Sequence, residues 1–282
     1  MKCLHPIDGH DCGKCMSCRL NRQLEKKTRI MHSAEYYDKK CFLTLTYDQD
    51  HVPMTKDGLS TLKKKEAQDF MKRFRRHIEP DEIKYFMCGE YGDTTYRPHY
   101  HVILLGVDMF DKRIFEIVRR FTSENWCKCK AWNKGQCTIA SFNEARAAYV
   151  AKYCLKKWSG KGSKEYYQGR EPEFCLSSQG LGLVWLEDHK ELVKKEGFVR
   201  LGKKRVPLPR YYEEKLFPKD TYRNIDWRSY KQAKGQQSFD EEKKRSGTSD
   251  KSSFEKWQEE VRKATANYMA TRIQRKGGTH NV

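Results

Sequence analysis

Two histidines separated by a single residue, His99 and His101, are the side chains whose types and spacing most directly suggest chemistry. In a strand, residues two apart project to the same face, so both imidazoles point one way and Tyr100 points the other. Two imidazoles at this spacing can share one cation. Imidazole suits Zn, Mn, Fe, Cu or Ni, so the spacing predicts a metal site without choosing the metal.

A third ligand is expected from the preceding strand, which ends at Glu90. A short turn folds that strand back beside His99, where the carboxylate can meet both histidines. Cys88 and Asp93 are alternative ligands, the first softer and the second less favourably placed. One carboxylate and two imidazoles leave coordination positions open, as a catalytic metal requires. An H-x-H pair also occurs by chance in many proteins.

Two tyrosines one helical turn apart suggest a nucleophile. A helix is predicted from Glu144 to about Trp158, with Asn143 as its cap. At about 100° per residue, its apolar stripe comprises Ala147, Val150, Ala151, Cys154 and Trp158. The opposite side, away from the core, gathers Tyr149, Lys152, Tyr153 and Lys156. The alternative is an ordinary amphipathic helix with surface tyrosines.

The chemistry of such a helix is attack by a phenolate on phosphorus. A covalent phosphotyrosine conserves the energy of the broken bond for later rejoining. Tyrosine titrates near ~10 in water, and a nearby ammonium or a metal-held phosphate favours its ionised form. Two tyrosines allow two successive transfers without release of the nucleic acid.

Cysteines at a two-residue spacing predict a zinc site near the N-terminus. Cys12, Cys15 and Cys18, with Cys3 upstream, can supply four thiolates to one Zn²⁺. His5 and His10 are alternative fourth ligands, and a flexible arm with free thiols is the alternative structure.

A second cysteine cluster, formed by Cys127, Cys129 and Cys137, lacks a clear fourth ligand, which leaves a second zinc site open. The remaining cysteines are predicted to be small core residues; these are Cys41, Cys88, Cys154 and Cys175.

The elements that position these groups follow from hydrophobic periodicity. Strands are predicted over residues 41–47, 83–89, 99–105 and 138–142. Helices are predicted over residues 21–38, from about Leu59 to a stop near Pro80, and over 111–121 and 144–158. The order of these elements predicts an α+β fold, in which helices flank a largely antiparallel central sheet.

Three regions are expected along the chain. Residues 1–38 form a cysteine-rich zinc-binding arm and a helix, and residues 39–217 form the main domain. Residues 218–282 form a basic tail. Within that tail, residues 228–253 are polar enough to be a linker or disordered, and an amphipathic helix begins near Phe254.

The composition indicates a polyanionic partner. The 282 residues carry a formal charge of +19, with 37% hydrophobic and 34% charged residues. Nucleic acid is the usual partner of a chain this basic. No apolar run is long enough to cross a bilayer, and the first residues do not form a secretory signal. A reducing compartment is therefore expected, with the 11 cysteines as thiols or metal ligands.

The motifs together resemble a known superfamily. Phe42-Leu43-Thr44-Leu45-Thr46, His99-Tyr100-His101 and Tyr149-x-x-x-Tyr153 are similar to the three ordered motifs of HUH endonucleases, the rolling-circle replication initiators. The N-terminal cysteines, Gly89-Glu90-Tyr91-Gly92 and Arg97-Pro98 resemble more narrowly the replication initiators of gokushoviruses, small single-stranded DNA phages of the microvirus group. The resemblance covers about residues 3–185.

This resemblance implies an HUH or RRM-like core and nicking of single-stranded phage origin DNA through a 5′-phosphotyrosine. It also implies Mg²⁺ or Mn²⁺, with Glu90 completing the metal site of His99 and His101. The setting would be the cytoplasm of the bacterial host, with a host helicase and replication proteins as further partners. The alternatives are a relaxase or transposase of the same superfamily, a non-catalytic zinc-dependent nucleic-acid-binding protein, and a metallohydrolase whose H-x-H pair activates water.

Overall fold

The computed structural model describes residue 3 and residues 11–92, 94–153, 162–219 and 221–277. The chain divides into two compact units. One comprises residues 22–209, and the other comprises residues 1–21 together with residues 210–282.

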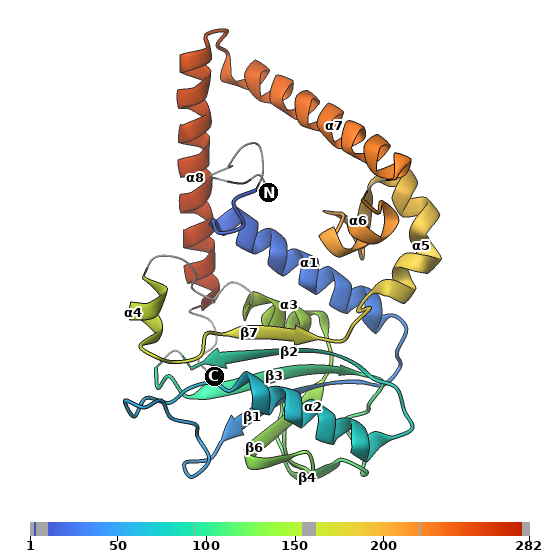
Figure 1. Ribbon diagram of the computed structural model, residues 1–282, viewed down its shortest axis with the longest axis vertical. Coiled ribbons are helices and arrows are strands. Elements are labelled where there is room, and N and C mark those ends of the chain that lie inside the picture. Colours follow the sequence, from blue (N-terminus) through green and yellow to red (C-terminus); the bar gives the residue numbers. More distant parts are fainter. Residues whose placement is uncertain (1–2, 4–10, 93, 154–161, 220, 278–282) are drawn as a thin grey trace. The chain divides into compact units, whose positions relative to one another are not determined.

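A seven-stranded sheet forms the centre of the unit 22–209 (Figure 1). Its strands are β1 (Lys40–Tyr47), β2 (Lys84–Tyr91), β3 (Pro98–Leu105), β4 (Phe115–Arg120), β5 (Asn125–Cys129), β6 (Trp132–Ser141) and β7 (Phe174–Ser177). Their order across the sheet is β4-β5-β6-β1-β3-β2-β7, and all neighbouring pairs are antiparallel. The strands β1 and β3 therefore lie at the centre, where both edges of each strand are paired.

Helix α2 (Lys64–Ile78) covers one face of the sheet. Its buried residues recur at helical spacing, and Phe70, Met71 and Phe74 pack in a core cluster with alternate residues of the central strands. Tyr100, Val102 and Leu104 are the residues that β3 contributes to this face. Strand alternation thus divides β3 between two separate cores.

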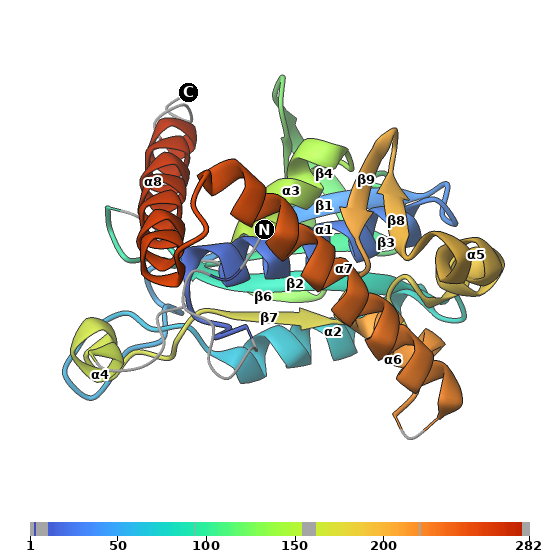
Figure 2. The ribbon, with the colours of Figure 1, turned by 90° about the horizontal axis from the view of Figure 1, so that it is seen from above.

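Helices α1 (Met16–Ala34) and α3 (Glu144–Lys152) cover the opposite face, with Ile30, Ala147 and Val150 buried against Phe42 and Ile103. In Figure 2, α2 and α3 lie on opposite sides of the sheet. The asparagine predicted to cap α3 does so, since Asn143 Oδ1 accepts from the backbone N–H of Arg146 at 2.8 Å.

Further elements complete this unit: helices α4 (Ser163–Tyr167) and α5 (Leu183–Glu196) and the hairpin of β8 (Phe198–Leu201) with β9 (Lys204–Pro207). His32 of α1 stacks on Trp185 of α5, with ring centroids 3.6 Å apart. The Nε2 atom of His32 donates to the Arg200 carbonyl in β8 at 2.8 Å. One buried side chain thus joins α1, α5 and β8.

The other unit contains the cysteine-bearing N-terminal residues and three helices, α6 (Arg210–Leu216), α7 (Tyr222–Ser246) and α8 (Lys251–Gly277). Trp227 of α7 stacks on Phe217 with centroids 4.4 Å apart. Phe239 of α7 contacts Phe254 of α8 edge-on at 5.2 Å. Aromatic pairs therefore account for much of the packing among these helices.

The expected fold class is confirmed: the chain is α+β, with an antiparallel sheet flanked by helices, a cysteine-rich N-terminal segment and a helical C-terminal region. The strands expected over 41–47, 83–89 and 99–105 correspond to β1, β2 and β3. The helix expected to end near Pro80 corresponds to α2, which begins at Lys64 rather than near Leu59.

Three local predictions are wrong. Residues 111–121 contain the strand β4, and not a helix. The strand expected over 138–142 is the end of the longer β6, which is preceded by β5. Most of residues 228–253, expected to be linker or disordered, belong to the 25-residue helix α7.

In the part of the chain that the structure describes, no helix is both long enough and apolar enough to cross a membrane.

Candidate active site

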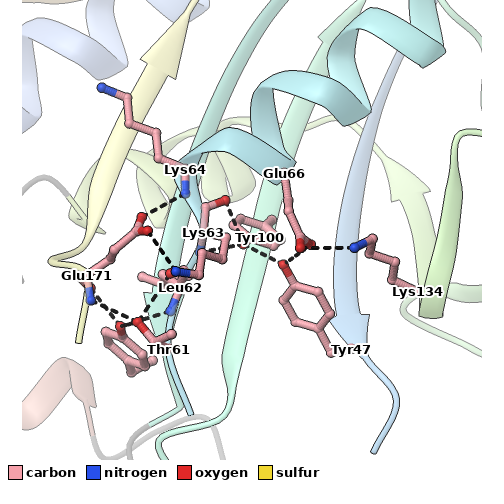
Figure 3. A network of polar contacts seen from close by, with 10 residues as sticks. Tyr47, Thr61, Leu62, Lys63, Lys64, Glu66, Tyr100, Lys134 and Glu171 are labelled. Atoms are coloured by element: carbon pink, nitrogen blue, oxygen red, sulfur yellow. Dashed lines mark hydrogen bonds and ion pairs between the residues drawn. The ribbon is translucent and has the colours of Figure 1, made fainter. Parts of the chain in front are cut away.

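The middle residue of the H-x-H motif anchors β3 from the face covered by α2. Tyr100 is fully buried, and its hydroxyl lies 2.8 Å from that of Tyr47. The backbone N–H of Lys63 donates to Tyr100 Oη at 3.0 Å, and Tyr47 Oη donates to Glu66 at 2.6 Å. Figure 3 shows this network below the start of α2. The network fixes β3 in place and turns His99 and His101 to the other face.

A threonine hydroxyl on β1 holds one ring nitrogen of each histidine. Thr44 Oγ1 lies 3.1 Å from His101 Nδ1, and Thr46 Oγ1 lies 2.9 Å from His99 Nδ1. These contacts follow from the register, in which Thr44 faces His101 and Thr46 faces His99. Metal-binding histidines commonly use one ring nitrogen for such an anchoring bond and the other for the ion. The arrangement leaves each Nε2 atom as the candidate ligand.

Glu90 lies within hydrogen-bond distance of His101. It is paired with His99 in the register of β2 and β3, but its Oε1 atom lies 2.7 Å from Nε2 of the diagonal neighbour His101. Both side chains are 7% exposed. Of the rival ligands, Cys88 faces His101 in the register and is fully buried. Asp93 lies outside the described residues.

The two tyrosines pack against the same histidine. Ring centroids of Tyr149 and Tyr153 lie 5.2 and 5.3 Å from that of His101, Tyr149 edge-on and Tyr153 stacked. The two tyrosine rings lie 5.0 Å apart and perpendicular. The structure thus brings together the tyrosine motif and the histidine motif, which are far apart in the sequence.

The expected orientation of the tyrosines is wrong. Tyr153 is 4% exposed and belongs to the same buried cluster as Val150 and Ala147, and Tyr149 is half-buried beside it. Both tyrosines face the sheet because α3 ends at Lys152 and Tyr153 is its C-cap, so an ideal helix through residue 158 gives the wrong direction.

The environment of Tyr153 opposes ionisation. Burial raises the pKa of its phenol well above the ordinary value, and the charge of Glu90 and the neighbouring Tyr149 raise it further. In this arrangement Tyr153 remains a neutral phenol. A cation that balanced the charge of Glu90 would lower this pKa.

Of the two lysines expected near the tyrosines, Lys152 is half-buried at the last position of α3. Lys156 lies outside the described residues, as do Cys154 and Trp158 of the expected apolar stripe. The described part of that stripe is confirmed, since Ala147, Val150 and Ala151 are fully buried.

The donor set of Glu90, His99 and His101 suits a divalent ion, because it offers one carboxylate and two imidazoles with anchored Nδ1 atoms. These three side chains are not drawn together as closely as the N-terminal cysteines are. Their role as ligands of Mg²⁺ or Mn²⁺ stays a prediction.

A separate candidate metal centre lies in the other unit. The Sγ atoms of Cys3, Cys12, Cys15 and Cys18 all lie within 4.8 Å of one another, and among the described residues this is the one group of three or more candidate ligands that does so. The Sγ atoms of Cys3 and Cys15 are 3.8 Å apart, and those of Cys15 and Cys18 are 3.5 Å apart. Tetrahedral zinc with bonds of about 2.3 Å requires sulfurs about 3.8 Å apart.

Backbone hydrogen bonds favour thiolate at this centre. The N–H groups of Cys15 and Lys14 donate to Cys12 Sγ at 3.3 and 3.4 Å. These bonds lower the pKa of Cys12 to about 6. The four cysteines could therefore hold a metal such as zinc. The alternative ligands His5 and His10 lie outside the described residues.

The second cysteine cluster is part of the core. Cys127, Cys129 and Cys137 are buried among the residues that α2 covers, and the Sγ atoms of Cys127 and Cys137 lie 3.5 Å apart. Cys41 and Cys88 are fully buried and Cys175 is half-buried. These thiols fill space between the sheet and its helices.

Thr44 and Thr46 are site residues that the motif analysis quoted without a role. Their spacing of two in a strand was the signal, since it matches that of the histidines. Arg146 had no signal: its guanidinium donates to the carbonyls of Ser141 and Ser123 at 2.9 and 2.6 Å, which ties α3 to the turn between β4 and β5.

The sheet and its tyrosine helix match a family model of replication-associated proteins of the ORF2 type over residues 40–158. A replication-associated protein VP4 of Bdellovibrio phage phiMH2K is 29% identical over 214 residues, which cover 72% of this chain and 66% of the relative. A replication-associated protein ORF2 of Spiroplasma virus 4 is 28% identical, with 74% and 68% covered.

A replication-associated protein ORF4 of Chlamydia phage 1 is 27% identical, with 73% of this chain and 53% of the relative covered. The matches thus span between about half and two thirds of these relatives. No solved structure matches the chain. The family model and the three phage relatives confirm that this chain resembles the replication initiators of small phages of the microvirus type.

Proposed function

We propose that the chain is a rolling-circle replication initiator that nicks and rejoins single-stranded phage origin DNA through a 5′-phosphotyrosine. The observation that carries the proposal is the packing of Tyr149 and Tyr153 against His101, which is itself hydrogen-bonded to Glu90. Nucleophile and candidate metal ligands thus share one side of β3. The names of the three relatives support a role in phage replication.

Glu90, His99 and His101 would hold Mg²⁺ or Mn²⁺. A divalent ion there would polarise the scissile phosphodiester and stabilise the charge that develops on its oxygens. The role of the chain's own residues is to orient the reaction. Thr44 and Thr46 fix the imidazoles, and Tyr100 holds their strand from the opposite face of the sheet.

Tyr149 is the proposed first nucleophile, because it is half-buried whereas Tyr153 is 4% exposed. Its phenolate oxygen forms a bond to phosphorus, the bond from phosphorus to the 3′ oxygen breaks, and the leaving 3′ oxygen takes up a proton. Tyr153 would serve the second transfer, and the free 3′ hydroxyl reverses the reaction during rejoining. The ammonium of Lys152 would favour the phenolate, a role also proposed for Lys156.

The cysteine group Cys3, Cys12, Cys15 and Cys18 would hold structural Zn²⁺. Single-stranded origin DNA is the proposed substrate, and a host helicase and replication proteins are proposed partners in the cytoplasm of a bacterial host. A relaxase or transposase would use the same chemistry, and the two tyrosines favour the repeated transfers of replication.

Adduct formation tests the proposal. The protein is incubated with Mn²⁺ and a labelled single-stranded oligonucleotide from the phage origin, then resolved on a denaturing gel. We expect a protein-linked band that is lost in the double variant Tyr149→Phe/Tyr153→Phe and strongly reduced in Tyr149→Phe alone. Tyr222→Phe, at a tyrosine 69% exposed on α7, is the matched control and should retain the band.

Each other outcome points to a different function. An adduct that persists in the double variant rules out these tyrosines as nucleophiles. Cleavage without an adduct favours a metallohydrolase, and retardation without cleavage favours a nucleic-acid-binding protein. His101→Ala should abolish the adduct if the imidazole serves the reaction.

A further inference from the structure

A row of side chains crosses the sheet from the candidate active site to its free edge. In the register, His101 of β3 faces Thr44 of β1, which faces Thr138 of β6. Thr138 faces Trp126 of β5, and Trp126 faces Arg119 of β4. Directly paired residues lie on the same face of a sheet. We call these five residues the His101–Arg119 row.

The row is open to solvent beyond the active site. His101 is 6% exposed, Thr44 and Thr138 are half-buried, and Trp126 is 39% exposed. Strands lie about 4.8 Å apart, so the backbone of Trp126 is about 14 Å from that of His101. On the other face, the partners of the same strands, Cys127 and Cys137, are buried under α2. Exposure of the indole is therefore a property of this face.

Positive charge lies at the outer end of the row. Arg119 is exposed, its guanidinium carbon lies 5.0 Å from the ring centroid of Phe121, and Phe121 is 51% exposed. Within the described residues, no carboxylate lies within ion-pair distance of Arg119, whereas the nearby Lys128 is 3.3 Å from Glu116. Cationic and aromatic side chains side by side are the combination that binds single-stranded nucleic acid.

The same part of the sheet is tied to the nucleophile helix. Arg146 of α3, which precedes Tyr149 by one turn, donates to the carbonyl of Ser123 between β4 and β5 at 2.6 Å. Glu124 in this turn accepts from the Thr138 hydroxyl at 2.9 Å. A carboxylate repels phosphates but accepts hydrogen bonds from the amino groups of bases. Bases rather than phosphates are therefore suited to the middle of the row.

We propose that the His101–Arg119 row is a binding track for unpaired nucleotides next to the cleavage position. A base stacks on Trp126, and a phosphate contacts Arg119. The proposal rests on the proposed function for its direction toward the active site, but not for the binding itself. Duplex DNA would not require an exposed indole, because its bases are stacked on one another and its affinity comes mainly from phosphate contacts.

Binding without cleavage tests the track. In the Tyr149→Phe/Tyr153→Phe background, fluorescence anisotropy gives the Kd for a labelled single-stranded oligonucleotide of mixed sequence and for the same oligonucleotide annealed to its complement. Loss of one stacked base weakens binding by about 5- to 100-fold, so Trp126→Ala should raise the single-strand Kd by that factor. It should change the duplex Kd less, and Trp126→Phe should restore most of the affinity.

Arg119→Ala has a matched control in its neighbour. Arg120 is also exposed, but it pairs with Asn125 and so lies on the other face. Arg119→Ala should weaken single-strand binding and reduce the slope of log Kd against log salt by about 0.7, and Arg120→Ala should do neither. Phe110→Ala, at a ring 56% exposed outside the row, is the control for Trp126→Ala.

The proposal is overturned if Trp126→Ala and Phe110→Ala have equal effects, or if the duplex loses as much affinity as the single strand. Adduct formation by the wild-type protein, together with unchanged Kd values in the row variants, would reject the track and leave the nicking function standing. Binding that depends on Trp126 in a protein that forms no adduct would reject the nicking function and retain the track.

Discussion

Thr44 and Thr46 decide which nitrogen of each histidine is available. A hydroxyl can donate to a ring nitrogen or accept from it. When His101 Nε2 donates to Glu90, the hydroxyl of Thr44 donates to Nδ1. Coordination through Nε2 requires the proton on Nδ1, and the same hydroxyl then accepts it. Threonine at these positions therefore serves both tautomers without moving a ring.

Replacing Thr44 by valine should weaken metal binding at the candidate active site. Valine keeps the shape and removes the hydroxyl, and loss of such a supporting bond commonly costs about 10- to 100-fold in metal affinity. Isothermal titration of Mn²⁺ into the wild type and Thr44→Val measures the effect, after the cysteine centre has been saturated with zinc.

Thr44→Ser is the conservative control and should bind Mn²⁺ nearly as well as the wild type, because it restores the hydroxyl. Equal affinities for Thr44→Val and Thr44→Ser would show that the hydroxyl has no such role. The circular dichroism spectrum of each variant checks the sheet.

At this scale the sequence predicted the identity of the site residues better than their orientation. The alternation that sends His99 and His101 to one face and Tyr100 to the other is a local property of a strand, and it is confirmed. The direction of Tyr153 depends on where α3 ends. The periodicity of apolar residues within a helix does not contain that information.

Among the elements, β4 illustrates why a periodic pattern can mislead. Phe110, Ile114, Val118 and Phe121 recur at intervals of three and four, which is typical of a helix. The segment nevertheless pairs with β5, and a register shift after Ile117 places Val118 outside the regular pairing. The irregularity disguises the alternation of a strand, so a contact with a later segment determines the structure.

The junction of α1, α5 and β8 predicts a loss of stability in mild acid. Burial lowers the pKa of His32 from 6.5 to about 4, and the nearby His189 lowers it further. As pH falls below 6.5, the unfolded chain binds a proton that the folded chain does not bind until about pH 4. Stability is therefore full above about 6.5 and should be about 2 kcal/mol lower at about pH 5.

Urea unfolding at neutral pH and in mild acid measures this difference. His32→Gln keeps an N–H donor for the Arg200 carbonyl but does not titrate, so its stability should depend less on pH. His77→Gln, at an exposed histidine of α2, is the control and should behave like the wild type. An unchanged pH dependence in His32→Gln would contradict the assignment.

Over the whole molecule, the two units differ in what holds them together. The unit 22–209 has a continuous sheet with a core on each face. The other unit has long, largely exposed helices joined by a few aromatic pairs, together with the four cysteines. A metal at these cysteines would supply cross-links that the sparse apolar contacts do not.

We therefore expect the purified protein to contain tightly bound zinc, which thiol modification releases. Cys15→Ser should lose that zinc and unfold at a lower temperature, because a structural zinc contributes directly to folding. Atomic emission spectroscopy measures the metal content. Cys175→Ser, at a half-buried cysteine of β7, should keep it. Equal zinc content in wild type and Cys15→Ser would exclude the centre.

The order of the strands has a consequence during synthesis of the protein. Strand β1 leaves the ribosome early, but its partners β3 and β6 follow tens of residues later, and the helix that carries Tyr149 comes after both. Edge strand β7 pairs with β2 only from Phe174 onward. Contacts this distant in sequence form slowly. A nascent chain that ends before β6 is complete therefore has its histidine strand but no nucleophile, so a prematurely terminated product could not cut DNA.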